Sequence, residues 1–377
     1  MKSILIVAGE ASGEMHAAAL VGELAAITAT PLQFFGCGGT EMRQAGVETL
    51  VDIGKLAVLG PLEALAHMGH YFDALRRLTE AARSRSPQMA ILVDFPDFNL
   101  RLAGRLKQLN IPVVYFISPQ VWAWRSGRIN HMRNVVDHML VILPFEQLFY
   151  AKHGVDVTYV GHPLVDRVKT TLTRTEFLQR YSLDGDRPVL SLLPGSRPKE
   201  IHYHLPILLE GARLVSWKHP VQVLLPLASS LDRARVERQV RDHSPDGFVR
   251  VIQGDTYNVV GHSEVAVVSS GTATLEAALL QTPLVTVFRI SHLTWIIGQY
   301  LVRVPHYSLV NLIADKPVVP ELFQSEFSAE RLAREVLNLL EDSSLRMRVK
   351  MELASVRQQL GEGGAISRAA SKIREWL

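Results

Sequence analysis

Acidic side chains follow two apolar runs in the first half of the sequence, where they could act as general bases. Glu10 follows the first run, in VAGEASGE, and Asp94 follows a later one, in VDFPDFN. A carboxylate at the carboxyl end of a parallel strand faces the ligand-binding edge of the sheet and can take a proton from a hydroxyl group. We expect Asp94 to be the base, because Asp97 follows Pro96 and is placed to cap a helix. The alternative, that Asp94 and Asp97 both cap helix ends, stays open.

The glycine turn VAGEASGE is not expected to bind a phosphate. Gly9 and Gly13 end an apolar strand and open an alanine-rich helix, and helix N-termini in general attract anions. However, the spacing is not the Gly-x-Gly-x-x-Gly of a dinucleotide site, and Glu10 and Glu14 would repel a phosphate. A nucleotide is therefore expected elsewhere in the chain.

The stretch LLPGSRPKEI predicts an anion site in the second half of the chain. Gly195 and Ser196 stand at the carboxyl end of an apolar strand, just before a helix. A glycine lets the backbone approach a ligand closely, and the N–H groups of Gly195 and Ser196 can point outward. Arg197 adds a planar fork that matches phosphate oxygens. The alternative is an ordinary Pro-Gly turn with a surface arginine.

The stretch VVSSGTATLE repeats this arrangement. An apolar strand ends in Ser270, Gly271 and Thr272, where a helix begins. The unpaired N–H groups and the dipole of that helix would hold a second anion. Glu276, one turn along, is placed to accept hydrogen bonds from ribose hydroxyls. Two such turns favour a nucleoside diphosphate, against the alternative in which a serine only caps the helix and Glu276 is a solvated charge.

The composition bounds the class of protein. The chain has 377 residues, of which 47% are hydrophobic and 20% charged, with a formal net charge of +3. These values are typical of a globular protein of two domains, and the charge is too small to indicate nucleic-acid binding. The single cysteine, Cys37, excludes an intramolecular disulfide and argues against a cysteine metal cluster. No run reaches the length of a signal peptide or the about 20 apolar residues of a spanning helix, so we expect a cytoplasmic protein.

The elements that must position these residues alternate between short β-branched runs and helical patterns. This alternation predicts an α/β fold with parallel sheets covered by helices on both faces. Strands are expected at 4–8, 32–35, 89–93, 113–117, 138–142 and 157–160, and then at 189–193, 221–226, 248–252, 265–269 and 284–288. Helices are expected at 71–85, 100–109, 144–153, 199–215, 231–242 and 272–280, and from 329 to 377 with a break at 361–364.

The alternation restarts after a polar, turn-rich segment at 160–188, so we expect two Rossmann-like, doubly wound domains with a cleft between them. The first domain is placed at 1–163 and the second at 164–355. The last helix, at 356–377, is expected to pack back on the first domain or on a partner chain, which would allow a homodimer.

Two apolar segments, at 56–68 and at 293–304, are too short to span a membrane. Each could lie in a bilayer interface or form an ordinary core helix. Trp122, Trp124 and Arg125 in SPQVWAWR suit a contact with a lipid or a sugar, or packing between domains.

Eight motifs occur in order between residues 7 and 314: VAGEASGE, VDFPDFN, SPQVWAWR, LPFE, VGHPL, LLPGSR, SSGTATLE and SLVNLIA. With them the sequence resembles the lipid A disaccharide synthases, bacterial inverting glycosyltransferases with the two-Rossmann GT-B architecture. The resemblance implies that UDP-2,3-diacylglucosamine and 2,3-diacylglucosamine 1-phosphate are joined into a β-1,6-linked disaccharide, with release of UDP and without a metal or cofactor. It implies work at the cytoplasmic face of the inner membrane, which the segment 56–68 would touch.

The resemblance also implies roles for single residues. Asp94 would be the base, with Glu10 as the alternative, and Arg197 would hold the donor phosphate. The other implied site residues are Gly9 and Ser12 on the acceptor side, Asn311 in the active site, and Gly195, Ser196, Ser270, Gly271, Thr272, Glu276 and Arg289 on the donor side. The chain departs from the family pattern at Glu14, where Asp is common, and at Phe288, where Tyr is common.

Two other functions stay open on the sequence. The first is another UDP-sugar enzyme of the same architecture, such as a UDP-N-acetylglucosamine 2-epimerase or the peptidoglycan lipid-linked transferase. An epimerase has no lipid acceptor, so the apolar 56–68 segment and the paired tryptophans argue against it. The second is a non-catalytic lipid-surface module that binds a nucleotide, and Asp94 at a cleft-facing strand end argues against that function.

Overall fold

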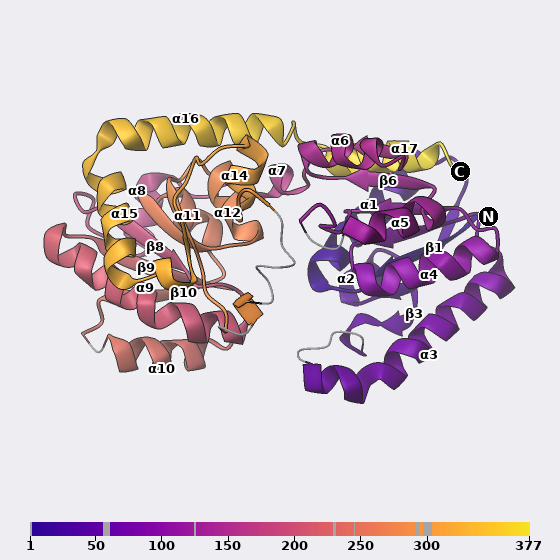
Figure 1. The fold of residues 1–377 in the computed structure, drawn as a ribbon, viewed down its shortest axis with the longest axis horizontal. Helices are drawn as coiled ribbons and strands as arrows, with labels where there is room; N and C mark the ends of the chain where they lie inside the picture. The colour runs from indigo at the N-terminus through magenta and orange to yellow at the C-terminus, as the bar shows by residue number, and fades with distance from the viewer. Residues whose placement is uncertain are drawn as a thin grey trace. The chain divides into compact units, whose positions relative to one another are not determined.

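The computed structural model describes residues 2–55, 61–123, 126–228, 231–244, 246–291, 294–296 and 304–377, and no side chain at residues 11, 55, 61–68 and 126. The fold is α/β and divides into two compact units (Figure 1). Unit 1 comprises Met1–Pro163 together with Glu362–Leu377, and unit 2 comprises Leu164–Gly361. Each unit is built around one parallel sheet.

The sheet of unit 1 has seven strands among the described residues, in the order β3-β2-β1-β4-β5-β6-β7, all parallel. They are β1 (Lys2–Ala8), β2 (Leu32–Gly38), β3 (Glu48–Asp52), β4 (Met89–Val93), β5 (Val113–Phe116), β6 (His138–Val141) and β7 (Val157–Tyr159). Successive residues of β1 enter different cores: Leu5 and Val7 join one cluster, whereas Ile4 and Ile6 join the other. Burial on both faces explains why the central strands read as continuous apolar runs.

The helices of unit 1 alternate with the parallel strands along the chain, as in a doubly wound domain. They are α1 (Ala11–Ile27), α2 (Thr40–Gln44), α3 (Pro61–Arg85), α4 (Pro96–Gln108), α5 (Ile129–Val135), α6 (Pro144–Lys152) and the C-terminal α17 (Ala365–Arg374), with 3-10 turns at Ile53–Lys55 and Ser126–Arg128. Helix α17 packs on α1 (Figure 1), because Ala369, Ala370 and Ile373 share a buried cluster with Ala17 and Leu20. The chain's end therefore completes the core of unit 1.

The sheet of unit 2 has six parallel strands among the described residues, in the order β10-β9-β8-β11-β12-β13. They are β8 (Val189–Leu193), β9 (Gln222–Leu227), β10 (Val249–Gln253), β11 (Val265–Ser269), β12 (Leu284–Phe288) and β13 (Glu321–Phe323). The helices are α7 (Leu164–Arg167), α8 (Arg174–Arg180), α9 (Pro198–Lys218), α10 (Arg233–His243), α11 (Thr256–Gly261), α12 (Thr272–Leu279), α14 (Leu309–Ala314), α15 (Ala329–Glu341) and α16 (Ser343–Gln359), with a 3-10 turn at Gln324–Glu326.

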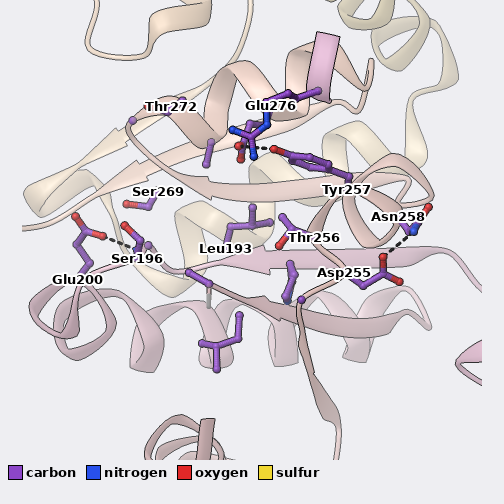
Figure 2. Close-up of a pocket in the computed structure, with 18 of the residues that line it drawn as sticks. Leu193, Ser196, Glu200, Asp255, Thr256, Tyr257, Asn258, Ser269, Thr272 and Glu276 are labelled. Atoms are coloured by element: carbon purple, nitrogen blue, oxygen red, sulfur yellow. Dashed lines mark hydrogen bonds between the residues drawn. The ribbon is translucent and has the colours of Figure 1, made fainter. Parts of the chain in front are cut away.

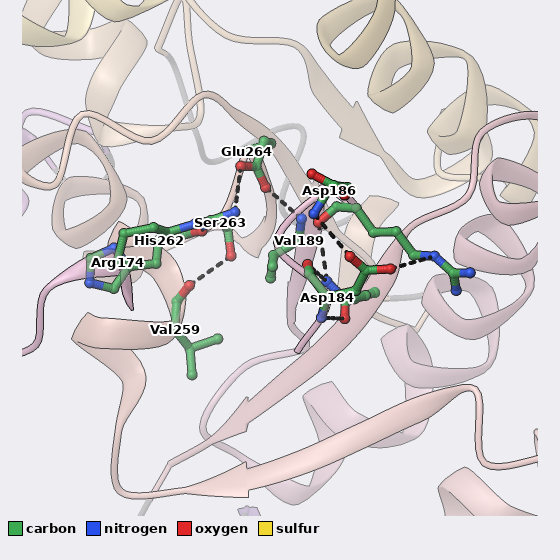
Figure 3. A network of polar contacts seen from close by, with 10 residues as sticks. Arg174, Asp184, Asp186, Val189, Val259, His262, Ser263 and Glu264 are labelled. Atoms are coloured by element: carbon green, nitrogen blue, oxygen red, sulfur yellow. Dashed lines mark hydrogen bonds and ion pairs between the residues drawn. The ribbon is translucent and has the colours of Figure 1, made fainter. Parts of the chain in front are cut away.

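A polar network fixes the start of unit 2 against its sheet (Figure 3). Arg174 pairs with Glu264 at 3.0 Å and donates to the carbonyl oxygen of His262, and Glu264 accepts from the N–H group of Val189. The turn-rich segment before β8 is thus tied to the first residue of β8 and to the loop before β11.

Every strand expected from the sequence is present, with ends that differ by a few residues. Two strands were not expected, β3 (Glu48–Asp52) and β13 (Glu321–Phe323), which lie at the edges of their sheets. The C-terminal region is helical, with the expected break between α16 and α17. Helix α3 begins at Pro61, ten residues before the helix expected at 71–85.

Parts of the apolar and aromatic segments lie outside the described residues, including 56–60, Trp124 and Arg125, and most of 293–304. Of the helices in the described part, none has both the length and the apolar character needed to cross a bilayer. Cys37 is buried, and this burial raises the pKa of its thiol to about 12, as expected of a packing residue.

Candidate functional site

A cavity of about 850 Å³ opens at the carboxyl edge of the sheet in unit 2 (Figure 2). Its walls are the ends of β8, β9, β10 and β11 and the starts of α9, α11 and α12. This is the edge at which doubly wound sheets bind ligands, and the volume is that of a site for a small molecule or nucleotide. All the predicted donor-side residues from Gly195 to Glu276 line it.

The turn at Gly271 leaves open space for a ligand. The φ of Gly271 is +150°, and a Cβ built there would meet nothing within 4 Å. Thr272 and Ala273 form the first turn of α12, where backbone N–H groups have no partner within the helix. The hydroxyl of Ser269 at the end of β11 is buried and has no hydrogen-bond partner among the described residues. The turn therefore has open space and polar groups without partners in the described part of the chain, and the anion site that the sequence predicts here stays a prediction.

The turn at Gly195 differs from the sequence prediction. The Glu200 carboxylate reaches back from the first turn of α9 and accepts hydrogen bonds from the N–H groups of Ser196 (2.8 Å) and Arg197 (3.2 Å) (Figure 2). A Cβ on Gly195 would stand 2.2 Å from an oxygen of Glu200, so the glycine makes room for this carboxylate. The prediction that the Ser196 N–H group is free for an anion is therefore wrong.

The side chain of Arg197 is nevertheless available at this turn. It is 76% exposed, lines the cavity, and stands 3.7 Å from an oxygen of Glu200. An exposed pair at this distance is weak, so the guanidinium can turn to a phosphate. The contribution of this turn to an anion site is thus a side chain and not backbone N–H groups.

Glu276 forms one wall of the cavity together with Tyr257. The Tyr257 hydroxyl donates to the Glu276 carboxylate at 3.2 Å (Figure 2). Burial raises the pKa of Glu276, while the hydroxyl of Tyr257 and the charge of Arg167 lower it in part. A half-enclosed carboxylate of this kind is suited to accept hydrogen bonds from sugar hydroxyls.

Among the lining residues that were not predicted from the sequence are Arg167, Lys169 and Tyr257. The two cations come from the segment that was interpreted only as a crossing between domains. Their signal was their position, two residues apart directly after the motif VGHPL. With Arg197 they give the cavity three cationic side chains, beside the carboxylates of Glu200, Asp255 and Glu276, and a diphosphate can pair with these cations.

At the carboxyl edge of unit 1, Asp94 follows β4 with a left-handed backbone. Its φ is +48° and that of Phe95 is +50°, each a conformation that costs a residue with a Cβ about 1–2 kcal/mol. Asn99 Nδ2 donates to the carbonyl oxygens of Val93 (3.2 Å) and Asp94 (2.7 Å), and the Tyr115 hydroxyl donates to that of Asp94 (2.5 Å). Two buried side chains therefore hold the strained turn that carries the predicted base.

The Asp94 carboxyl has a raised pKa. Burial, with a smaller contribution from the negative charge of Glu10, raises its pKa to about 6. Such a group is ionised at pH 7 and binds a proton more readily than an ordinary aspartate does. Glu10 and Ser12 are exposed at the start of α1. The charge of Glu10 contributes to the raised pKa of Asp94, so the two carboxyl groups lie near enough to interact.

The glycine turn of VAGEASGE is explained by packing. A Cβ on Gly9 would lie 2.0 Å from the ring of Phe95, so Gly9 lets the Asp94–Phe95 turn approach β1. Glu14 accepts hydrogen bonds at 2.9 and 3.3 Å from two N–H groups at the start of α2. Glu14 thus caps a helix, and its charge is used inside unit 1.

Glu146, in the motif LPFE, is a buried carboxylate that is not among the predicted site residues. It accepts hydrogen bonds from the Ser118 hydroxyl (2.7 Å), the Trp122 indole N–H (3.0 Å) and the Leu143 N–H (3.0 Å). Burial raises its pKa to about 7, and these hydrogen bonds lower it in part. Glu146 therefore fixes the loop after β5, the strand that pairs with β4, next to Asp94.

Asn311 and Arg289 do not line the 850 Å³ cavity. The Asn311 amide is buried and fully used: Oδ1 accepts from the N–H groups of Val318 and Val319, and Nδ2 donates to the Val319 carbonyl and the Glu321 carboxylate. An amide with four such partners has no capacity left for a substrate, so a catalytic role of Asn311 stays a prediction without support from its contacts. Arg289 directly follows β12 at the same edge of the sheet.

No group of three or more His, Cys, Asp or Glu side chains in the described part of the chain is arranged to hold a metal ion.

The family model and the relatives that match this chain carry the same family name. The model of a family described as lipid-A-disaccharide synthetase matches residues 4–374. A lipid-A-disaccharide synthase of Solibacter usitatus is 44% identical, over 100% of this chain and 98% of that protein. One of Myxococcus xanthus is 45% identical, over 99% of this chain and 97% of that protein.

Solved structures at low sequence identity share the fold. The UDP-GlcNAc 2-epimerase from Neisseria meningitidis, bound to UDP-GlcNAc, has a TM-score of 0.64 at 12% identity and covers 100% of this chain and 99% of its own. The calicheamicin glycosyltransferase CalG4 has a TM-score of 0.61 at 15% identity, with coverage of 100% and 98%. These likenesses show the GT-B fold class.

Proposed function

The chain belongs to the lipid-A-disaccharide synthase family, and from this premise we propose how its residues divide the reaction. It is a glycosyltransferase of lipid A biosynthesis, which condenses UDP-2,3-diacylglucosamine with 2,3-diacylglucosamine 1-phosphate to give the β-1,6-linked disaccharide 1-phosphate and UDP. The sequence prediction of this activity is confirmed by the family match and by the relatives. The alternatives, an epimerase or a non-catalytic module, are not supported.

The UDP part of the donor binds in the cavity of unit 2. The observation that carries this proposal is the open turn at Gly271, placed at the start of α12 in a cavity that also holds Arg167, Lys169 and Arg197. The first turn of α12 would receive the diphosphate, and Glu276 would accept hydrogen bonds from the ribose hydroxyls. The three cations would balance the diphosphate charge, so the proposed reaction uses no metal and no cofactor.

The acceptor is activated in unit 1. Asp94 takes the proton of the acceptor's 6-hydroxyl as its oxygen attacks the anomeric carbon of the donor. The bond from that carbon to the UDP oxygen breaks in the same step, which inverts the configuration. The leaving UDP keeps the bonding electron pair, and Arg197 with the start of α12 stabilises the developing charge. The pKa of about 6 at Asp94 supports this role.

We also propose peripheral contact with the cytoplasmic face of the inner membrane, where both lipid substrates would be reached. The apolar sequence at 56–68 supports this contact, as does Phe72 of α3, which is 46% exposed. Binding of the full chain to phospholipid vesicles, measured by sedimentation, tests it. That the chain forms a homodimer stays a prediction. Light scattering on the purified chain tests it by measuring the molar mass in solution.

The activity itself is tested with the purified chain and both acylated substrates. The expected result is UDP release that depends on the acyl acceptor, with a product of the mass of the disaccharide. Conversion of UDP-N-acetylglucosamine to its C2 epimer without an acceptor would instead show an epimerase. Binding of UDP without any turnover would show a non-catalytic module.

A further inference from the structure

His204 is a buried histidine outside the predicted site, and it contacts two loops at the edge that holds the cavity. It lies on α9 and is 0% exposed. One loop is Pro194–Arg197, which follows β8, and the other begins at Arg289, which follows β12. Strand β11 lies between β8 and β12 in the sheet, so the two loops flank the strand end that carries Gly271.

The contacts of His204 fix the position of one proton. Nδ1 lies 2.7 Å from the carbonyl oxygen of Pro194, which can only accept, so Nδ1 carries a proton. Nε2 lies 2.9 Å from the N–H group of Arg289 and 3.1 Å from its carbonyl oxygen, and in the neutral ring it accepts a hydrogen bond from that N–H group. The imidazole therefore joins the two loops as a donor on one side and an acceptor on the other.

The surroundings keep the ring neutral. The rings of Phe288 and Phe327 lie with their centres 6.0 and 5.8 Å from that of His204. Burial lowers the pKa of His204, and the positive charge of Arg289 lowers it further, whereas the carbonyl oxygens of Pro194 and Arg289 and the charge of Glu200 act in the opposite sense. The neutral ring with its proton on Nδ1 is the form in which Nε2 can accept the hydrogen bond from the Arg289 N–H group.

Helix α9 holds the Gly195 loop at two points. Glu200 takes the N–H groups of Ser196 and Arg197, and His204, one turn later on the same face, takes the carbonyl of Pro194. The loop thus has its backbone fixed on both sides of Gly195. Of these two residues of α9, His204 also contacts Arg289, which directly follows β12.

We propose that His204 is a positioning residue of the donor site, which fixes the loops of Arg197 and Arg289 on the two sides of the Gly271 turn. The proposal rests on the proposed binding of UDP in this cavity. His204 does not line the cavity and is not a catalytic residue. Its effect is to keep the site's walls in place before the nucleotide arrives, which lowers the ordering cost of binding.

The test compares His204→Phe with His204→Gln. Phenylalanine keeps a ring in the apolar site but removes both hydrogen bonds, whereas glutamine keeps one donor and one acceptor. We expect His204→Phe to raise the Kd of UDP, measured by calorimetry, and the KM of the donor by about tenfold, with kcat changed by less than about threefold. His204→Gln should recover part of the affinity.

His138 provides a matched control. It is also a buried histidine with two hydrogen bonds, to Asp156 (2.7 Å) and Thr158 (3.0 Å), but it belongs to unit 1. His138→Gln should leave the Kd of UDP unchanged. A Kd within about twofold of the wild-type value in His204→Phe overturns the proposal, and so does an equal loss in His138→Gln. Failure of the wild-type chain to bind UDP would instead overturn the proposed function.

Discussion

The two sheet edges reach unusual backbone conformations in different ways. In unit 1, Asp94, Phe95 and Ile117 have φ values of +48°, +50° and +65°, although each carries a Cβ. In unit 2, the residues that line the cavity with a positive φ are glycines: Gly195 at +117°, Gly254 at +82° and Gly271 at +150°. The turn that carries the proposed base is therefore strained, whereas the turns around the proposed nucleotide site use glycine, for which a positive φ carries no steric cost.

The two sheet edges also differ in the charged side chains that they carry. The edge of unit 1 carries Asp94 and Glu146, carboxyl groups whose burial raises their pKa values to about 6 and about 7. The cavity of unit 2 carries Arg167, Lys169 and Arg197. In the proposed function the edge of unit 1 moves a proton and the cavity of unit 2 holds an anion, and each half of this comparison can be tested separately.

The largest expected effect is on turnover, at the edge of unit 1. Asp94→Asn keeps the shape of the side chain but removes the base, so kcat should fall by about 10²–10⁴-fold. The Kd of UDP should not change, because the proposed nucleotide site lies in unit 2. Steady-state kinetics and calorimetry on the same preparation measure both. A kcat near the wild-type value would move the role of base to Glu10.

The next effect concerns leaving-group stabilisation in unit 2. Arg197→Ala should lower kcat by about 10²–10³-fold, as for the loss of one charge-stabilising donor. Lys169→Ala removes a cation from the wall of the same cavity and serves as the control for a general loss of positive charge. If Arg197→Ala and Lys169→Ala have the same small effect, Arg197 has no special place at the diphosphate.

The open turn gives a binding effect of intermediate size. Gly271→Ala puts a Cβ into space that is empty in the free chain, at a φ of +150°. We expect the Kd of UDP to rise about tenfold or more, from backbone strain and from contact with the ligand. Gly247→Ala is a suitable control, because Gly247 also has a positive φ and open space but does not line the cavity. Equal affinities of the Gly271 variant and the wild-type chain would move the diphosphate away from α12.

Most of the fold could be predicted from the sequence, because strands buried on both faces appear as short apolar, β-branched runs. The two missed strands, ETLVD and ELF, are short edge strands with charged residues, and their pattern is too brief to distinguish from a turn. Asp94, Gly271 and Glu276 could be read from the motifs, because Asp94 directly follows a strand, Gly271 precedes the first residue of a helix and Glu276 lies one turn into that helix.

Other parts of the site depend on tertiary structure. Arg167 and Lys169 line the cavity because the first residues of unit 2 fold against it, which no local pattern indicates. The use of the Ser196 N–H group by Glu200 was readable in principle, since a glutamate three residues after Arg197 has the spacing of a capping box.

The pH dependence of catalysis tests the protonation of Asp94. Its pKa of about 6 predicts that kcat/KM falls about tenfold per pH unit below pH 6, because only the ionised carboxylate can accept the proton. Asp94→Asn should lose this limb and retain a flat residual rate. A limb near pH 4 in the wild-type chain would mean that the group is not buried as described.

The smallest effect is on stability, and it links the two properties of Asp94. A carboxyl whose pKa is raised from 3.8 to about 6 on folding stabilises the native state fully below pH 4 and loses this contribution as the pH rises through 6. Asp94→Asn removes the ionised form, so its free energy of unfolding should exceed that of the wild-type chain at pH 8, by about 1–3 kcal/mol, and match it at pH 4. Urea unfolding at the two pH values measures the difference.

Asp97→Asn is the control for that measurement, because Asp97 lies on the same turn but is exposed, in a pair with Arg128. It should change the free energy of unfolding by less than about 1 kcal/mol at both pH values. Glu146 also has a raised pKa, but it is present in the wild-type chain and in both variants, so its contribution cancels when their free energies of unfolding are subtracted. A gain for Asp94→Asn at pH 8 alone would show that the native fold holds an ionised carboxylate at a cost in stability, which is the property expected of a catalytic base. Equal stability of Asp94→Asn and the wild-type chain at pH 8 would contradict the description of Asp94 as a strained, desolvated carboxylate.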